Sequence, residues 1–148
     1  MPYAGEKMSI KITPADKAFS LCVRARANFR CEKCGKQHSH NSKGLHCSHH
    51  HSRGNWSIRF DPLNAESLCY GCHAKHGGTE ERRKATLTPG EQELLFERKM
   101  NTLLGRMYRK THGKGDIAKH FRDEYKKICE KRERGDFGRI DFEGYYNA

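Results

Sequence analysis

Residues 31–73 read CEKCGKQHSHNSKGLHCSHHHSRGNWSIRFDPLNAESLCYGCH. This stretch opens with one C-x-x-C pair, Cys31 and Cys34, and a second pair, Cys69 and Cys72, stands near its end. A turn around each pair can direct two sulfurs at one ion, and four thiolates complete the closed tetrahedral shell of a structural zinc site. The spacing therefore predicts one zinc ion per chain that holds two distant segments together.

The composition of the 148-residue chain indicates why such an ion is needed. Hydrophobic residues make up 34% and charged residues 32%, and the mean hydropathy is −1.00. A chain with so little apolar surface buries a small core, and zinc binding contributes on the order of 10 kcal/mol to the folding of such domains. The seven cysteines fit metal ligation in a reducing compartment better than disulfides.

The chain lacks the sequence features of membrane insertion and export. No apolar run near the N-terminus has the length of a signal peptide, and none approaches the roughly 20 apolar residues of a membrane helix. We therefore expect a cytoplasmic protein with no membrane partner.

The charge predicts a polyanionic partner. The formal net charge is +11 at pH 7. Lys and Arg outnumber Asp and Glu along residues 1–134, and only residues 135–148 are acidic. Basic side chains gain affinity for nucleic acids by releasing counterions from the phosphates.

Helix start signals divide the chain. Thr13, Pro14 and Asp16 predict the start of a helix over residues 13–29, and TPGE at 88–91 predicts a capping box at the start of a second helix. Apolar residues then recur at helical spacing until THGKGD at 111–116, after which a third helix is expected to end near residue 134. The last two helices are expected to form a hairpin that packs on the middle of the chain.

The fold class predicted is α+β. Residues 31–79 have room for a β-hairpin and a short helix near 70–77. We divide the chain into a flexible leader (1–12), a zinc-braced core with the N-terminal helix (13–80), a basic helical region (81–134) and a glycine- and aromatic-rich tail (135–148) that is either mobile or docked through its rings.

Histidines fill the space between the cysteine pairs. A cluster lies at 46–51, Asn64 follows it, and His73 comes directly after the second pair. This order resembles the HNH, or ββα-metal, nuclease family, in which zinc knuckles often brace the fold. The resemblance is closer to the NinG (Rap) recombination nucleases of lambdoid phages, through CEKCG, HCSHH, RFDPLN, CYGC and a basic C-terminal helix with DEYKKICEK, and it covers about residues 17–133.

The resemblance implies a small ββα-metal core and an activity. The activity is metal-dependent hydrolysis of phosphodiester bonds in branched recombination intermediates, of the Holliday-junction or D-loop type, in the cytoplasm of a bacterial host if the chain is phage-encoded. His49 corresponds to the general base, Asn64 to the residue that orients the base or the loop, and His73 to a metal ligand. An imidazole suits the first role because its pKa lies near neutrality.

One position departs from the family pattern. The residue before the base is usually Asp or His and serves as the second ligand, but here it is Ser48. Either His46 supplies the missing ligand, or the register shifts by one residue so that His49 is the ligand and His50 the base. His76 lies one helical turn from His73 and is a candidate further ligand. The catalytic ion expected is magnesium or manganese, although nickel and zinc also accept such donors.

Further expectations concern DNA contacts, alternative functions and assembly. The expected DNA contacts are basic residues near the histidines and on the later helices: Arg53, Arg59, Lys75, Arg106, Arg109, Lys110, Lys126 and Lys127. A sequence-specific or nicking HNH endonuclease and a non-catalytic zinc-ribbon DNA-binding protein are the alternatives. A homodimer would suit paired cuts across a four-way junction.

Overall fold

The computed structural model describes residues 11–145, except for the side chain of Glu80, and has an α+β fold. The predicted leader falls outside the described residues, apart from Lys11 and Ile12. No helix in the described range is long and apolar enough to cross a membrane. The elements in chain order are α2 (Pro14–Arg26), β1 (Leu45–His49), η1 (Trp56–Ile58), η2 (Pro62–Asn64), β2 (Ala65–Cys69), α3 (Tyr70–His76), α4 (Glu80–Lys84), α5 (Pro89–Lys99), α6 (Thr102–Thr111), η3 (His112–Lys114) and α7 (Asp116–Glu133).

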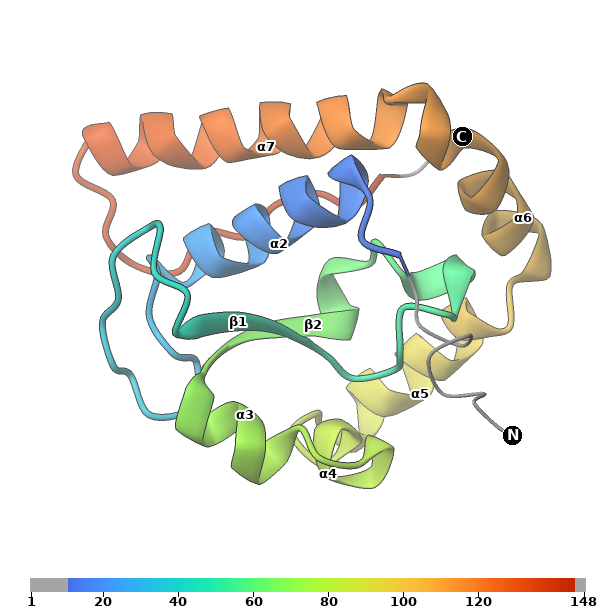
Figure 1. The fold of residues 1–148 in the computed structure, drawn as a ribbon, viewed down its shortest axis with the longest axis horizontal. Helices are drawn as coiled ribbons and strands as arrows, with labels where there is room; N and C mark the ends of the chain where they lie inside the picture. The colour runs from blue at the N-terminus through green and yellow to red at the C-terminus, as the bar shows by residue number, and fades with distance from the viewer. Residues whose placement is uncertain (1–10, 146–148) are drawn as a thin grey trace.

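The main hydrophobic core lies between α2 and α7, which run side by side (Figure 1). The N-terminal helix starts where the sequence predicts. The hydroxyl of Thr13 accepts the backbone N–H of Asp16, and the Asp16 carboxylate accepts the backbone N–H of Thr13. The buried ring of Phe19 then makes edge contacts with the rings of Phe60 and Phe121. Burial of an aromatic ring of this size contributes about 2–3 kcal/mol to stability.

The two strands form an antiparallel pair between α2 and α3 (Figure 1). Leu45 pairs with Cys69 and His49 with Ala65, so the start of β1 lies beside the second cysteine pair. α3 follows β2 without a loop. In the described range the sheet has only these two strands, which leaves one edge of β1 without a strand partner.

Asp16 also anchors a buried arginine. Arg59 is 2% exposed, and its Nε and Nη2 donate to the two oxygens of Asp16 at 3.0 and 2.6 Å. Its guanidinium lies 4.2 Å from the centre of the Trp56 ring. Burial raises the pKa of Asp16, but the hydrogen bonds and charge of Arg59 outweigh it and hold that pKa below its usual value. The prediction that Arg59 contacts DNA is therefore wrong, because its charge is buried in an ion pair.

The region after TPGE forms two helices where the sequence predicts one. The capping box of Thr88 and Glu91 is present at the start of α5. α5 ends at Lys99, and the side chain of Asn101 starts α6 by accepting the backbone N–H of Leu104 at 3.0 Å. Three residues of the apolar stripe are exposed around this break: Phe96 54%, Met100 60% and Leu103 73%. The simple two-helix hairpin is therefore wrong.

The last helix and the tail close the core. α7 spans the predicted range and buries Ile117, Phe121 and Ile128. The chain then turns back, and Ile140 and Phe142 are buried against the same core. Of the rings in the tail, that of Phe142 is docked on this core, whereas Phe137 is 69% exposed.

Candidate functional site

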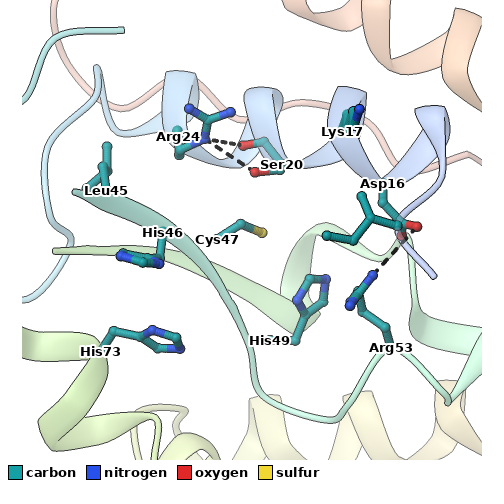
Figure 2. A pocket seen from close by; sticks show the side chains of 11 residues that line it. Asp16, Lys17, Ser20, Arg24, Leu45, His46, Cys47, His49, Arg53 and His73 are labelled. Atoms are coloured by element: carbon teal, nitrogen blue, oxygen red, sulfur yellow. Dashed lines mark hydrogen bonds and ion pairs between the residues drawn. The ribbon is translucent and has the colours of Figure 1, made fainter. Parts of the chain in front are cut away.

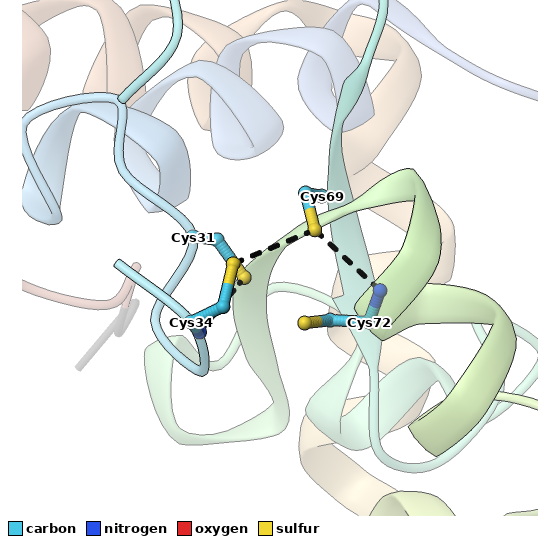
Figure 3. A group of neighbouring side chains, drawn as sticks. All are labelled: Cys31, Cys34, Cys69 and Cys72. Carbon is cyan, nitrogen blue, oxygen red and sulfur yellow. Dashed lines mark hydrogen bonds between the residues drawn. The ribbon is translucent and has the colours of Figure 1, made fainter. Parts of the chain in front are cut away.

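The four predicted zinc ligands converge (Figure 3). Cys31 and Cys34 come from the segment after α2, and Cys69 and Cys72 from the junction of β2 with α3. Their sulfur atoms all lie within 4.8 Å of one another, and those of Cys34 and Cys69 are 3.7 Å apart. Sulfurs that bind a tetrahedral zinc at about 2.3 Å lie about 3.8 Å from one another. The cluster can therefore hold a metal ion such as zinc.

The electrostatics of this cluster also fit a cation. The backbone N–H groups of Cys34 and Cys72 point at the sulfurs of Cys31 and Cys69, each at 3.5 Å. Burial raises the pKa of Cys31, but hydrogen bonds from the backbone of Cys34, Cys69 and Lys33 outweigh it and lower that pKa to about 6. Burial and hydrogen bonds with the other three sulfurs raise the pKa of Cys72 to about 12. Closely packed thiolates repel one another, and a divalent cation relieves that repulsion.

The predicted catalytic histidines line a cavity of about 600 Å³ whose walls come from α2, β1 and α3 (Figure 2). His46, His49 and His73 all contribute to it, together with Cys47. An adjoining cavity of about 330 Å³ shares His49 and His73 and also includes Arg83. Burial raises the pKa of Cys47 to about 12, so this residue stays a neutral thiol in the cavity wall.

His46 and His73 form the pair best suited to metal binding. Their ring centres are 5.1 Å apart with an angle of 31° between the planes. Burial, and then the charge of His46, lower the pKa of His73, which favours the neutral imidazole that binds metal. Within residues 11–145, the four cysteines are the one group of three or more possible ligands whose donor atoms all lie within 4.8 Å. His46 and His73 could therefore offer two adjacent nitrogen ligands to an ion in this cavity.

His49 has the properties of a neutral base. It ends β1, and its ring stacks on Phe19 with centres 5.9 Å apart. Its Nε2 atom is buried and has no hydrogen-bond partner among the described residues. Burial, and then the charge of Arg53, lower the pKa of His49 to about 4. Arg53 lies 3.8 Å from the carboxylate of Asp16, so the charge beside the imidazole is held in place by α2.

Asn64 fixes the chain where it leaves β1. Its side chain is fully buried, and its amide accepts the backbone N–H of His51 at 2.9 Å and donates to the carbonyl of His51 at 3.0 Å. Its backbone carbonyl accepts the N–H of His50 at 2.8 Å. The two residues that directly follow His49 are therefore held by the backbone and the side chain of one residue, Asn64.

His50 faces another part of the molecule. It is buried, and its Nδ1 lies 2.8 Å from the backbone carbonyl of Arg83 in α4. Neither His50, the buried Ser48 nor His76 lines either of the two cavities. The geometry therefore favours His46 as the second ligand over the shifted register with His50 as the base. It gives no support to His76 as a further ligand.

The other predicted DNA contacts lie at the surface. Arg53 is half-buried and lines both cavities. The ammonium of Lys127 donates to Glu124 at 2.8 Å and is 66% exposed. Among the predicted DNA contacts, the side chains that are exposed to solvent are those of Lys75, Arg106, Arg109, Lys110, Lys126 and Lys127.

Two elements contribute residues that the sequence did not indicate. From α2, Phe19 contacts the ring of His49 and Asp16 holds Arg53. From α4, Arg83 donates to the carbonyls of His50 and Gly77 at 3.1 and 3.0 Å and lines the smaller cavity. The capping box placed Asp16 at a helix start, but nothing local to the sequence indicated its ion pairs.

Comparison with known proteins found no relative of this chain. No protein-family model matches the chain, and no curated protein or solved structure matches it. The functional assignment therefore depends on the geometry and chemistry of the site itself.

Proposed function

We propose that the protein is a metal-dependent DNA endonuclease of the HNH, or ββα-metal, type that cuts branched recombination intermediates. One observation carries the proposal: His46, His49 and His73 line one cavity next to a four-cysteine cluster that can hold zinc. His46 and His49 lie in β1 and His73 in α3, and β2 pairs with β1 and leads directly into α3, an arrangement that supports a ββα core. The zinc ion would join the segment after α2 to the start of α3, and so keep His73 beside β1.

Phosphodiester hydrolysis needs a base, positive charge at the scissile phosphate and fixed geometry. A divalent ion bound by His46 and His73 would supply that charge at the phosphate and the leaving oxygen. His49 is neutral at pH 7, lines the cavity and would take a proton from the attacking water. Arg53 would contact a phosphate oxygen while Asp16 keeps it in place.

The donor set also bears on the choice of catalytic ion. Two imidazoles without a carboxylate suit ions that accept nitrogen, whereas magnesium prefers oxygen ligands. We therefore favour manganese over magnesium in the catalytic position. Nickel and zinc belong in the same test.

The proposal is tested by cleavage of a matched set of DNAs in the presence of each ion. We expect a Holliday junction and a D-loop to be cut at least about tenfold faster than linear duplex of the same sequence, because shape and backbone contacts carry the recognition. Omission of the added ion is expected to stop cleavage. Equal rates on branched and linear DNA would remove branch selectivity and favour the sequence-specific or nicking alternative. Binding without cleavage, for every ion, would favour the zinc-ribbon DNA-binding alternative.

A further inference from the structure

One face of α2 forms a wall of the catalytic cavity that the proposed chemistry does not use. Lys17, Ser20 and Arg24 are three and four residues apart, so they lie on the same face of the helix. All three line the cavity of about 600 Å³ that His46 and His49 also line (Figure 2). A basic helix face therefore lies across the cavity from the proposed metal ligands.

Arg24 is oriented in a way that suits an anion. Its Nε lies 3.2 Å from the backbone carbonyl and 3.3 Å from the hydroxyl of Ser20 (Figure 2). The described residues offer no hydrogen-bond or ion-pair partner to its two terminal amino groups, or to the exposed ammonium of Lys17. A guanidinium held in one orientation matches the fork of phosphate oxygens.

The dimensions fit one strand of DNA. From Lys17 to Arg24 the helix rises about 10 Å at 1.5 Å per residue, which is about the axial length of three nucleotides of one strand at 3.4 Å each. The cavity volume of about 600 Å³ falls in the range of about 300–1,000 Å³ that encloses a single small organic ligand. Such a space accepts a nucleotide of one strand, but it does not accept both strands of a duplex.

We infer that this face of α2 binds the phosphates of the scissile strand, and that the nucleotide beside the cut enters the cavity unpaired. The inference rests on the proposed function and deepens it, since it names an unpaired strand as the element of branched DNA that the site recognises. A nucleotide that is already unpaired at a branch or flap enters such a site at the lowest cost, because no base pair has to be opened.

The first test measures how the binding of a single-stranded oligonucleotide depends on salt. The comparison is between the wild type, Lys17→Gln/Arg24→Gln, and Lys36→Gln/Lys43→Gln, which removes the same charge from exposed residues that line neither cavity. The slope of log Kobs against log salt is negative, and each lost phosphate contact makes it less steep by about 0.7 for single strands. The slope of the α2 variant is therefore expected to be less steep than that of the wild type by about 1.4. The control variant should keep the wild-type slope.

A second test separates this inference from the nuclease proposal. The wild type and the α2 variant are each used to cut a flap DNA and a fully paired DNA of the same sequence. The ratio of the cleavage rate on the flap to that on the paired DNA should be at least about tenfold smaller for the α2 variant than for the wild type. An unchanged salt slope, or an equal change in the control variant, would overturn the α2 inference even if the wild type cuts DNA. A reduced slope in a protein that cuts no DNA would support the α2 site and overturn the nuclease proposal.

Discussion

Replacement of one zinc ligand, Cys72→Ser, is expected to release the ion and to unfold the segments that it joins. The buried apolar residues around the cluster are few, with Leu45 and Leu68 beside Cys31, so little besides zinc holds this part together. Zinc binding of this kind is worth on the order of 10 kcal/mol, which is comparable with the total stability of a domain, about 5–15 kcal/mol. Zinc content and hydrogen exchange of the amides in β1, β2 and α3 measure the effect.

The matched control is Cys129→Ser, which makes the same chemical change outside the cluster. Cys129 is half-buried on α7 and is not one of the four converging cysteines. This variant is expected to keep one zinc per chain and normal protection of β1 and β2. If Cys72→Ser also kept its zinc and its protection, the cluster would not be the brace that holds the site.

A large loss of cleavage rate is expected for His49→Ala. Removal of a general base typically slows a reaction by about 10²–10⁴-fold, while binding of DNA should stay within about twofold because the phosphate contacts remain. His49→Gln keeps most of the side-chain volume next to Phe19 and is expected to be equally slow. Single-turnover cleavage of a labelled junction measures the chemical step, and binding in the absence of added ion measures affinity.

Two other histidines provide the comparisons. His40→Ala changes an exposed residue that lines neither cavity and should cut at the wild-type rate. His50→Ala removes the bond to the carbonyl of Arg83, so it is expected to loosen α4 and to slow cleavage less than His49→Ala does. A variant series in which His50→Ala loses cleavage and His49→Ala keeps it would favour the shifted register.

Local signals in the sequence predicted much of the fold. Thr13 with Asp16 and Thr88 with Glu91 marked two helix starts, because a capping box satisfies backbone donors within four residues of chain. The C-x-x-C spacing predicted the convergence of four cysteines, because each pair forms its own turn. Each capping box and each cysteine turn lies within a short segment, although the two cysteine pairs meet across 35 residues of chain.

Long-range packing decided two of the features that the sequence did not predict, and a local cap decided a third. Arg59 was expected at the DNA surface, but its partner Asp16 lies 43 residues away in the sequence. The break between α5 and α6 depends on Asn101, whose side chain caps a helix start inside a stretch with continuous helical spacing. The contact between Phe19 and His49 likewise joins α2 to β1. Nothing close to Arg59 or Phe19 in the sequence indicates their partners, whereas the cap that Asn101 provides to Leu104 is a local contact.

The central claim is that sulfur-bound zinc joins the segment after α2 to the β2–α3 junction, and that this keeps the histidines of β1 and α3 together so that they bind a separate catalytic ion. Metal analysis after exhaustive dialysis, followed by calorimetric titration with manganese, tests it most directly. The account predicts one zinc per chain that survives dialysis, and a second, weaker manganese site that disappears in His46→Ala/His73→Ala. A chain that keeps its zinc but binds no manganese, or binds it equally well in the double variant, would contradict the account.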